Sequence, residues 1–347
     1  MKKLTVRQKS HQLSRARDEA KKKRRANKDS NAKPFILNAV FRKQNPQKIR
    51  EPKIFTAPAP ENFNLRPENC EKVIQYINNI KKSAAKKWNI VIDLSKVKDL
   101  KEGAIAMLLS VVTEIKGVKK VSVSGIAPSD RLLRTTLEKS NFFENVPVKG
   151  QPAITTVRDF LRSGKKGDPR NFLAEQIRKA MDTVWSQSGR NPNLRTVIFE
   201  MMRNSCDHAF QNKKDIRWHL SISHDRPNNL VKFSFVDNGE GIPRTLVKNY
   251  LTSIKTMFSG DAEMLEAAYH GESKSRTQLP WRGKGLPTIY ESSFERHIKN
   301  FLVISNGVFL HFDSKIRENL KVPFRGTYYY WEIDMSCVKT CFPDENI

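Results

Sequence analysis

Three short segments in the C-terminal half of the sequence combine carboxylates, amides and glycines in a fixed order. Glu200 and Asn204 stand four residues apart, Asp237 opens the sequence Asp-Asn-Gly-Glu-Gly, and Leu286 closes the sequence Arg-Gly-Lys-Gly-Leu. A carboxylate can act as a general base, an amide oxygen suits a hard cation such as magnesium, and glycines let the backbone approach a ligand closely. Together, these segments predict a site for a magnesium-bound adenine nucleotide.

The first segment has the spacing of an amphipathic helix over about 194–210, and Asn193 is expected to cap its start. Residues at i, i+4, i+7 and i+8 share one face of a helix. The polar face consists of Glu200, Asn204, Asp207 and His208, and the opposite face of Val197, Ile198, Met201, Met202 and Cys206. The helix can therefore present one face to a core and the other to a ligand.

The second segment follows an expected strand, and the third opens an expected helix. The alternating residues 231–236 lead into Asp237, which is followed by a turn that contains Gly239 and Gly241. These two glycines permit positive φ and a close approach to a planar ligand. At the start of a helix, exposed N–H groups and the helix dipole favour phosphate oxygens, and Lys284 adds a positive charge there.

These segments resemble the nucleotide-binding boxes of the GHKL ATPase superfamily, which includes gyrase, the heat-shock chaperone, histidine kinases and MutL. The matches are Glu-x-x-x-Asn with a following Asp-His-Ala, Asp-x-Gly-x-Gly, Gly-x-Gly-Leu, and Gly326-Thr327 as the last box. The resemblance covers about residues 171–335 and leaves 336–347 as a C-terminal tail. It implies a Bergerat-type α/β sandwich with a mixed, mostly antiparallel sheet, in which the nucleotide lies between helices and sheet.

For the nucleotide base, the resemblance implies four contacts. Asp237 would accept a hydrogen bond from the adenine amino group, and Thr327 would assist through a water molecule. Gly239 and Gly241 would let the base approach the backbone. These residues would therefore determine binding itself.

For the metal and the reaction, the resemblance implies two further roles. Asn204 would offer its carbonyl oxygen to Mg²⁺, and Glu200 would orient and deprotonate the water that attacks ATP. Arg203 and Asp207 are either part of this polar network or structural. ATP and Mg²⁺ are thus the expected ligands.

For the phosphates, the resemblance implies a glycine-rich loop and a lid. The phosphate loop consists of Gly283, Lys284, Gly285 and Leu286. The lid would span about 243–281, with Ser273, Lys274, Ser275 and Arg276 near its end. Closure of the lid over ATP would be the conformational step.

Helical and strand-like patterns alternate over about 61–148, which predicts a further α/β unit with helices covering a sheet. The expected helices are 70–85, 103–115 and 129–140, and the expected strands are 89–94 and 121–124. The fold class of the whole chain is therefore α/β in the broad sense, of the α+β kind.

Residues 61–148 resemble a STAS domain, the module of anti-anti-sigma factors and sulfate transporters. The resemblance rests on Asp93-Leu-Ser-Lys-Val after the first strand, on the helix led by Gly103, and on the Ser-Gly-Ile-Ala-Pro turn that ends at Pro128. Regulatory members carry a phosphorylatable serine directly before the helix glycine. Glu102 occupies that place here, either as a permanent negative charge or as a plain surface residue.

Residues 1–50 form an expected basic and flexible tail, and 149–170 an expected connector. The tail holds seventeen Lys and Arg residues against three Asp and Glu, and the whole chain has a net charge of +27. Its basic run consists of Lys21, Lys22, Lys23, Arg24 and Arg25. The tail is either an arm that binds nucleic acid by counterion release, a segment that docks on an acidic protein, or merely solvated.

The four cysteines form no CxxC pair and no zinc-like spacing, which indicates structural thiols in a reducing compartment. No apolar run approaches the roughly 20 residues that span a bilayer, and no apolar stretch follows the first lysines as in a secretory signal. We therefore expect a cytoplasmic protein without membrane contact.

Three functions fit these residues. The first is a Mg-dependent ATPase that acts as a conformational switch for a protein or nucleic-acid partner, with a homodimer as one possible assembly. The second is a serine/threonine protein kinase resembling anti-sigma factors, since a histidine kinase would need an acceptor-helix motif that the seven histidines do not form. The third is a scaffold that binds nucleotide without turnover.

Overall fold

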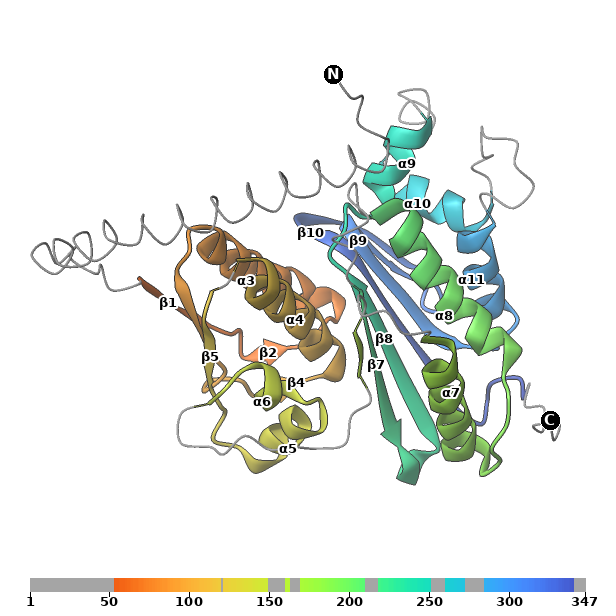
Figure 1. The fold of residues 1–347 in the computed structure, drawn as a ribbon. Helices are drawn as coiled ribbons and strands as arrows, with labels where there is room; N and C mark the ends of the chain where they lie inside the picture. The colour runs from red at the N-terminus through yellow and green to blue at the C-terminus, as the bar shows by residue number, and fades with distance from the viewer. Residues whose placement is uncertain are drawn as a thin grey trace, which may run out of the picture. The chain divides into compact units, whose positions relative to one another are not determined.

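The computed structural model describes residues 53–119, 121–148, 160–162, 169–209, 218–250, 260–271 and 284–339. Residues 53–347 form one compact unit, whose helices and strands are shown in Figure 1. The expected basic tail, with the run 21–25, lies outside the described residues.

The described chain begins with a three-stranded parallel sheet of order β1-β3-β5. In β3 the β-branched side chains of Ile90 and Ile92 are buried, as the strand-like pattern predicts. The strands are β1 (Ile54–Pro58), β3 (Asn89–Asp93) and β5 (Val123–Ile126), and the short strands β2 (Asn62–Phe63) and β4 (Asp99–Leu100) pair with each other.

Four helices accompany this sheet, and one of them is enclosed on all sides. Every residue from Gly103 to Val112 in α4 is buried, which is the pattern of a helix packed on all sides. Accordingly, α4 contacts α3 as well as strands β7 (Trp218–Asp225) and β8 (Leu230–Asp237) of a second sheet. The helices are α3 (Pro67–Ala85), α4 (Glu102–Glu114), α5 (Arg131–Lys139) and α6 (Phe142–Asn145).

The second sheet has the order β6-β7-β8-β10-β9. All its neighbouring strand pairs within the described residues are antiparallel, where a mixed sheet was expected. Two of these pairs are hairpins, because β7 and β8 are joined by the short turn 226–229, and β9 and β10 by 312–315. The strands are β6 (Phe160–Arg162), β7 (Trp218–Asp225), β8 (Leu230–Asp237), β9 (Lys299–His311) and β10 (Ile316–Ile333).

Further helices lie along this second sheet, coloured green to blue in Figure 1. Helices α7, α10 and α11 contribute Leu173, Leu265 and Ile289 to a core that also contains Phe233 and Trp331 of the sheet. The helices are α7 (Pro169–Trp185), α8 (Pro192–Asn204), α9 (Ile242–Tyr250), α10 (Asp261–Tyr269) and α11 (Gly285–Phe294).

Strand β10 takes part in two separate cores. Tyr328 belongs to the core that contains Val73 of α3 and Ala104 of α4, whereas Tyr329 and Trp331 belong to the core of the later helices. Successive side chains of a strand point to opposite faces. The second sheet is therefore covered on both faces, by the early helices on one and by the later helices on the other.

Gly103 allows α4 to approach this sheet closely. A Cβ atom at Gly103 would overlap the hydroxyl of Tyr328, which lies 3.3 Å from the Ser234 hydroxyl. The neighbouring Glu102 lies 3.9 Å from Lys232 of β8, and its side chain is 31% exposed. The position expected from a STAS-like phosphorylation site thus faces the second sheet.

Helix α8 begins two residues earlier than the sequence predicted. Asn191, not Asn193, caps α8: its side-chain oxygen accepts a hydrogen bond from the Leu194 N–H at 2.9 Å. Pro192 occupies the first turn, where its missing N–H costs nothing. Helix α8 ends at Asn204 and continues as the π-helical turn Ser205–Ala209.

The broad fold class is confirmed, because the described chain combines helices with a parallel and an antiparallel sheet. The expected helices and strands of 61–148 are present, with β5 two residues later than predicted. None of the helices in the described ranges is long and apolar enough to span a membrane.

Candidate functional site

Asp237 ends β8 and is buried, with 3% of its surface exposed. Its Oδ1 accepts a hydrogen bond from the Gly239 N–H at 2.9 Å, and its Oδ2 accepts one from the Ser205 hydroxyl at 3.1 Å. Ser205 directly follows Asn204 in the sequence. The Ser205 hydroxyl therefore ties the end of α8 to the end of β8, so that two of the predicted segments meet.

Opposing effects act on the pKa of Asp237. Burial raises the pKa of this carboxyl to about 6, while three hydrogen bonds and the positive charge of Lys81 in α3 act in the opposite direction. The group is therefore ionised at neutral pH. A carboxylate oxygen can accept two hydrogen bonds, so Asp237 retains acceptor capacity for a ligand donor.

Thr327 lies directly beside Asp237, in register across the β8–β10 pair. Its hydroxyl lies 3.1 Å from the Ser305 hydroxyl, which in turn accepts a hydrogen bond from the Ile242 N–H at 2.8 Å. Gly326 has a φ of +132°, and a Cβ atom there would collide with the backbone carbonyl of Asp237. The predicted Gly-Thr box thus adjoins the carboxylate, and its glycine permits the close strand approach.

Of the two glycines for which positive φ was predicted, Gly241 has it, with a φ of +84°, and Gly239 does not. A side chain at Gly241 would also collide with Asn306. The Asn306 amide donates to the Glu240 carbonyl at 2.8 Å and accepts from the Arg244 N–H at 3.3 Å. Asn306 thereby fixes the turn that follows Asp237.

The third segment meets the first where α11 begins. A Cβ atom placed on Gly285 would lie 2.8 Å from Glu200 Oε2 and 3.2 Å from Asn204 Oδ1. Gly285 is the first residue of α11, and Lys284 precedes it as an exposed residue. The Glu200 carboxylate, the Asn204 amide and the N-terminus of α11 therefore lie close together.

The polar surroundings of Glu200 come from its own helix. Arg203 lies 3.9 Å from Glu200 and 3.6 Å from Asp207, and the Glu200 side chain is 23% exposed. The Asn204 amide nitrogen is buried and forms no hydrogen bond of standard geometry in the described part of the chain. The Asn204 side chain nevertheless lies near the Tyr329 hydroxyl and interacts with it electrostatically. The Asn204 oxygen is the atom nearer to Gly285.

These residues fit a magnesium ion that arrives with a nucleotide. In the described ranges, no group of three or more His, Cys, Asp and Glu residues is placed to hold a metal. Magnesium usually takes one or two protein ligands and completes its shell with water and substrate phosphates. The Asn204 oxygen beside Glu200 suits that role, whereas a resident metal centre would need more ligands.

Some predicted site residues lie outside the described ranges. They are Gly283 of the phosphate loop and Ser273, Lys274, Ser275 and Arg276 of the lid. The side chain of His208 is likewise not described. Of the expected lid, the described parts are α9 and α10, and Leu286 packs against the core beneath α11.

The structure adds four polar residues that the sequence did not predict. Ser205 could have been found, because it directly follows the helix motif. Ser305 and Asn306 lie far along the chain in β9, and Lys81 lies in the N-terminal half. Only the three-dimensional fold brings these last three side chains to the turn after Asp237.

A scan against protein-family models finds no matching family. A search of curated proteins finds no matching sequence. The interpretation of the site therefore rests on the geometry of its own residues.

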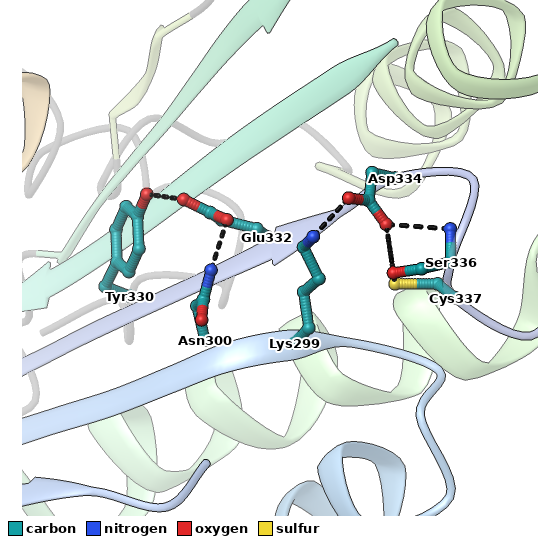
Figure 2. A network of polar contacts seen from close by, with 7 residues as sticks. All are labelled: Lys299, Asn300, Tyr330, Glu332, Asp334, Ser336 and Cys337. Atoms are coloured by element: carbon teal, nitrogen blue, oxygen red, sulfur yellow. Dashed lines mark hydrogen bonds and ion pairs between the residues drawn. The ribbon is translucent and has the colours of Figure 1, made fainter. Parts of the chain in front are cut away.

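A second polar cluster lies beside β9 and the end of β10. It consists of Lys299, Asn300, Tyr330, Glu332, Asp334, Ser336 and Cys337 (Figure 2). Asp334 pairs with Lys299, and the Cys337 thiol is 6% exposed with its pKa raised by burial. A buried thiol with a raised pKa is a poor nucleophile. We therefore regard this cluster as structural: it joins the C-terminal end of β10 to β9.

Proposed function

We propose that the chain binds Mg·ATP at this site and hydrolyses it, acting as a nucleotide-driven switch for a protein or nucleic-acid partner. The observation that supports the proposal is the position of Gly285 at the start of α11, where a Cβ atom would lie 2.8 Å from Glu200 Oε2 and 3.2 Å from Asn204 Oδ1. In this arrangement Glu200 would act as a general base and Asn204 as a metal ligand, beside a helix end that favours anions.

At the base end of the site, Asp237 would accept the adenine amino group. Its burial and its ionised state at neutral pH support this role. Thr327 and Ser305 form a hydroxyl pair next to it, and such a pair can hold a bridging water. The backbone at Gly241, free of a side chain, would lie against the plane of the base.

At the phosphate end, the N–H groups of α11 would receive the phosphate oxygens. Magnesium, when bound, would neutralise phosphate charge and polarise the phosphorus centre. Asn204 would hold the ion in place through its side-chain oxygen. Glu200, partly open to solvent, would orient a water and take its proton, which contributes typically about 10²–10⁴-fold to rate.

The test is Glu200→Ala, compared with Glu175→Ala on the exposed surface of α7 as the matched control. We expect the Glu200 variant to retain ATP but to lose at least about 100-fold in turnover, because only the base is removed. The Glu175 variant should behave as wild type. Release of phosphate from γ-labelled ATP and equilibrium binding of ATP measure the two quantities.

The same assay separates the competing functions. Label transferred to a serine or threonine of a partner would indicate a kinase, and binding without any turnover would indicate a scaffold. If Glu200→Ala hydrolyses ATP at the wild-type rate, the assignment of the base is wrong. If the wild-type chain does not bind Mg·ATP, the proposed function fails as a whole.

A further inference from the structure

Lys81 reaches the proposed nucleotide site from α3, in the N-terminal half of the chain. Its ammonium donates a hydrogen bond to the Asn238 side-chain oxygen at 3.0 Å and lies 3.7 Å from Glu114. It also lies 5.4 Å from the centre of the Phe324 ring, and its side chain is only 21% exposed. Asn238 stands between Asp237 and Gly239, inside the turn that would receive the base.

This position is unusual for a lysine. Removing an ammonium from water costs free energy unless a partner compensates, and burial here lowers the pKa of Lys81 while Glu114 opposes the shift. The closest polar partner is Asn238, since Glu114 is beyond hydrogen-bond distance. The next residue, Lys82, is exposed and shares the same helix end.

The hydrogen bond determines which way the Asn238 amide faces. A lysine ammonium only donates, so it must bind the oxygen of the amide and not the nitrogen. The Asn238 nitrogen then points away from Lys81; it is buried and has no hydrogen-bond partner among the described residues. An unpaired buried donor costs free energy, which an ordered water or a purine acceptor that enters the turn beside Asp237 would offset.

We propose that Lys81 is a positioning residue for the nucleotide base, which acts by orienting Asn238 and the turn from Asp237 to Gly241. This inference rests on the proposed function. It makes base recognition dependent on α3, because the residue that sets the turn belongs to that helix. Helix α3 also packs on β10, so the coupling runs through one continuous core.

Coupling between two regions is reciprocal in free energy. A nucleotide that requires the Lys81–Asn238 contact will therefore stabilise α3. We expect amide hydrogen exchange in residues 67–85 to slow when Mg·ATP is added to the wild-type chain. The same protection should be absent when Lys81 is replaced.

The decisive experiment compares Lys81→Met with Lys82→Met in the full chain. We expect Lys81→Met to bind Mg·ATP about 10-fold or more weakly, the usual size for loss of a hydrogen bond to a charged group. The ratio of ATP to GTP affinity should fall as well, because base recognition is affected and phosphate binding is not. Lys82→Met should match wild type in both quantities, as measured by calorimetry.

Two further variants show whether Lys81 acts through Asn238. Adding Lys81→Met to Asn238→Ala should cause little further loss, and Lys81→Arg should restore part of the ATP preference. An unchanged ATP-to-GTP ratio in Lys81→Met, or unchanged exchange of α3 in wild type with ATP, overturns the proposal. If Lys81→Met does not fold, Asn238→Ala carries the test of the ratio. Wild type that binds neither nucleotide refutes the proposed function instead.

Discussion

The Asp237 carboxyl is buried at the end of β8, and its pKa of about 6 lies above the ordinary value of 3.8. In this case the folded state binds the proton more tightly than the unfolded state does. The contribution of Asp237 to the free energy of unfolding is therefore greatest below the pKa of the unfolded state, and it is lost as pH rises through the pKa of the folded state. Strongly shifted pKa values are common at functional sites, so the raised pKa of Asp237 supports its proposed role in binding.

We therefore predict that Asp237→Asn stabilises the fold near pH 8, by on the order of 1–3 kcal/mol, since each pKa unit corresponds to about 1.4 kcal/mol. The gain should shrink towards zero near pH 4, where the wild-type carboxyl is protonated in the folded state. The same variant should lose ATP binding, because the amide cannot replace both acceptor oxygens. Urea unfolding at several pH values, with Asp182→Asn as the exposed control, measures the first effect. A variant that is less stable than wild type at pH 8 would contradict this account.

The sequence predicted Glu200, Asn204, Asp237 and Thr327 as neighbours in a site, and the structure brings them together. Their proximity could be predicted because helical spacing and short glycine-containing turns are local properties of the chain. Lys81 was not predicted, because a lysine on a helix ordinarily faces solvent. Its burial depends on the packing of α3 against β10, which no local pattern encodes.

At the scale of elements, Gly285 at the start of α11 gives a prediction about phosphate binding. Gly285→Ala would place a methyl group 2.8 Å from Glu200 Oε2. The helix itself should tolerate alanine, which has the higher helix propensity by about 1 kcal/mol. We predict unchanged or slightly higher stability together with at least about 10-fold weaker binding of the triphosphate.

The control for this variant is Gly260→Ala, where the added methyl group would meet Asn319 only at 3.5 Å. Calorimetric titration with ATP measures the binding, and thermal unfolding measures the stability. Equal ATP affinity in Gly285→Ala and wild type would show that the phosphates do not approach this helix end.

The packing of α4 on the second sheet gives a prediction about stability. Gly103→Ala introduces a methyl group into the space of the Tyr328 hydroxyl, which belongs to a rigid buried ring. Overpacking of this kind typically costs about 1–3 kcal/mol. We expect a loss of this size in urea unfolding, and a partial recovery when Tyr328→Phe is added, because the ring carbon Cζ still lies 3.2 Å from the added methyl group. Recovery should be absent if the loss arises elsewhere in α4.

Element boundaries were predicted less well than the elements themselves. Asn191 and Asn193 both precede the apolar pattern of α8, and either could cap the helix. Asn191 is the cap because Pro192 already lies in the first turn of the helix. Two of the antiparallel pairs in the second sheet are hairpins with short turns at 226–229 and 312–315, which the sequence pattern did not predict. The alternating pattern of β8, in contrast, predicted its strand to within a residue.

At the scale of the whole molecule, the sequence predicted separate STAS-like and GHKL-like units joined by a connector. One of the two hydrophobic cores in the described residues contains Ile77 and Ala104 from the predicted STAS-like unit together with Val236 and Ile304 from the predicted GHKL-like unit. Each half therefore supplies apolar surface that the other half buries. Composition and periodicity cannot reveal such sharing, because they report only that a face is apolar.

The basic tail gives a prediction at this scale. Replacing Lys21, Lys22, Lys23, Arg24 and Arg25 by Gln in the full chain should weaken DNA or RNA binding and flatten its salt dependence. On duplex DNA, the slope of log affinity against log salt should fall by about 0.9 for each phosphate that the tail no longer neutralises. Fluorescence anisotropy at several salt concentrations measures this slope. ATP binding serves as the control, and an unchanged slope would show that the run does not bind nucleic acid.

Tyr328 and Tyr329 point to opposite faces of β10 and belong to different cores. A one-residue insertion between them would exchange the faces of the following side chains as far as the next register shift, at Tyr330–Glu332. A two-residue change would preserve the sidedness and shift only the pairing. A one-residue insertion between Tyr328 and Tyr329 should therefore lower the free energy of unfolding more than a two-residue insertion at the same place.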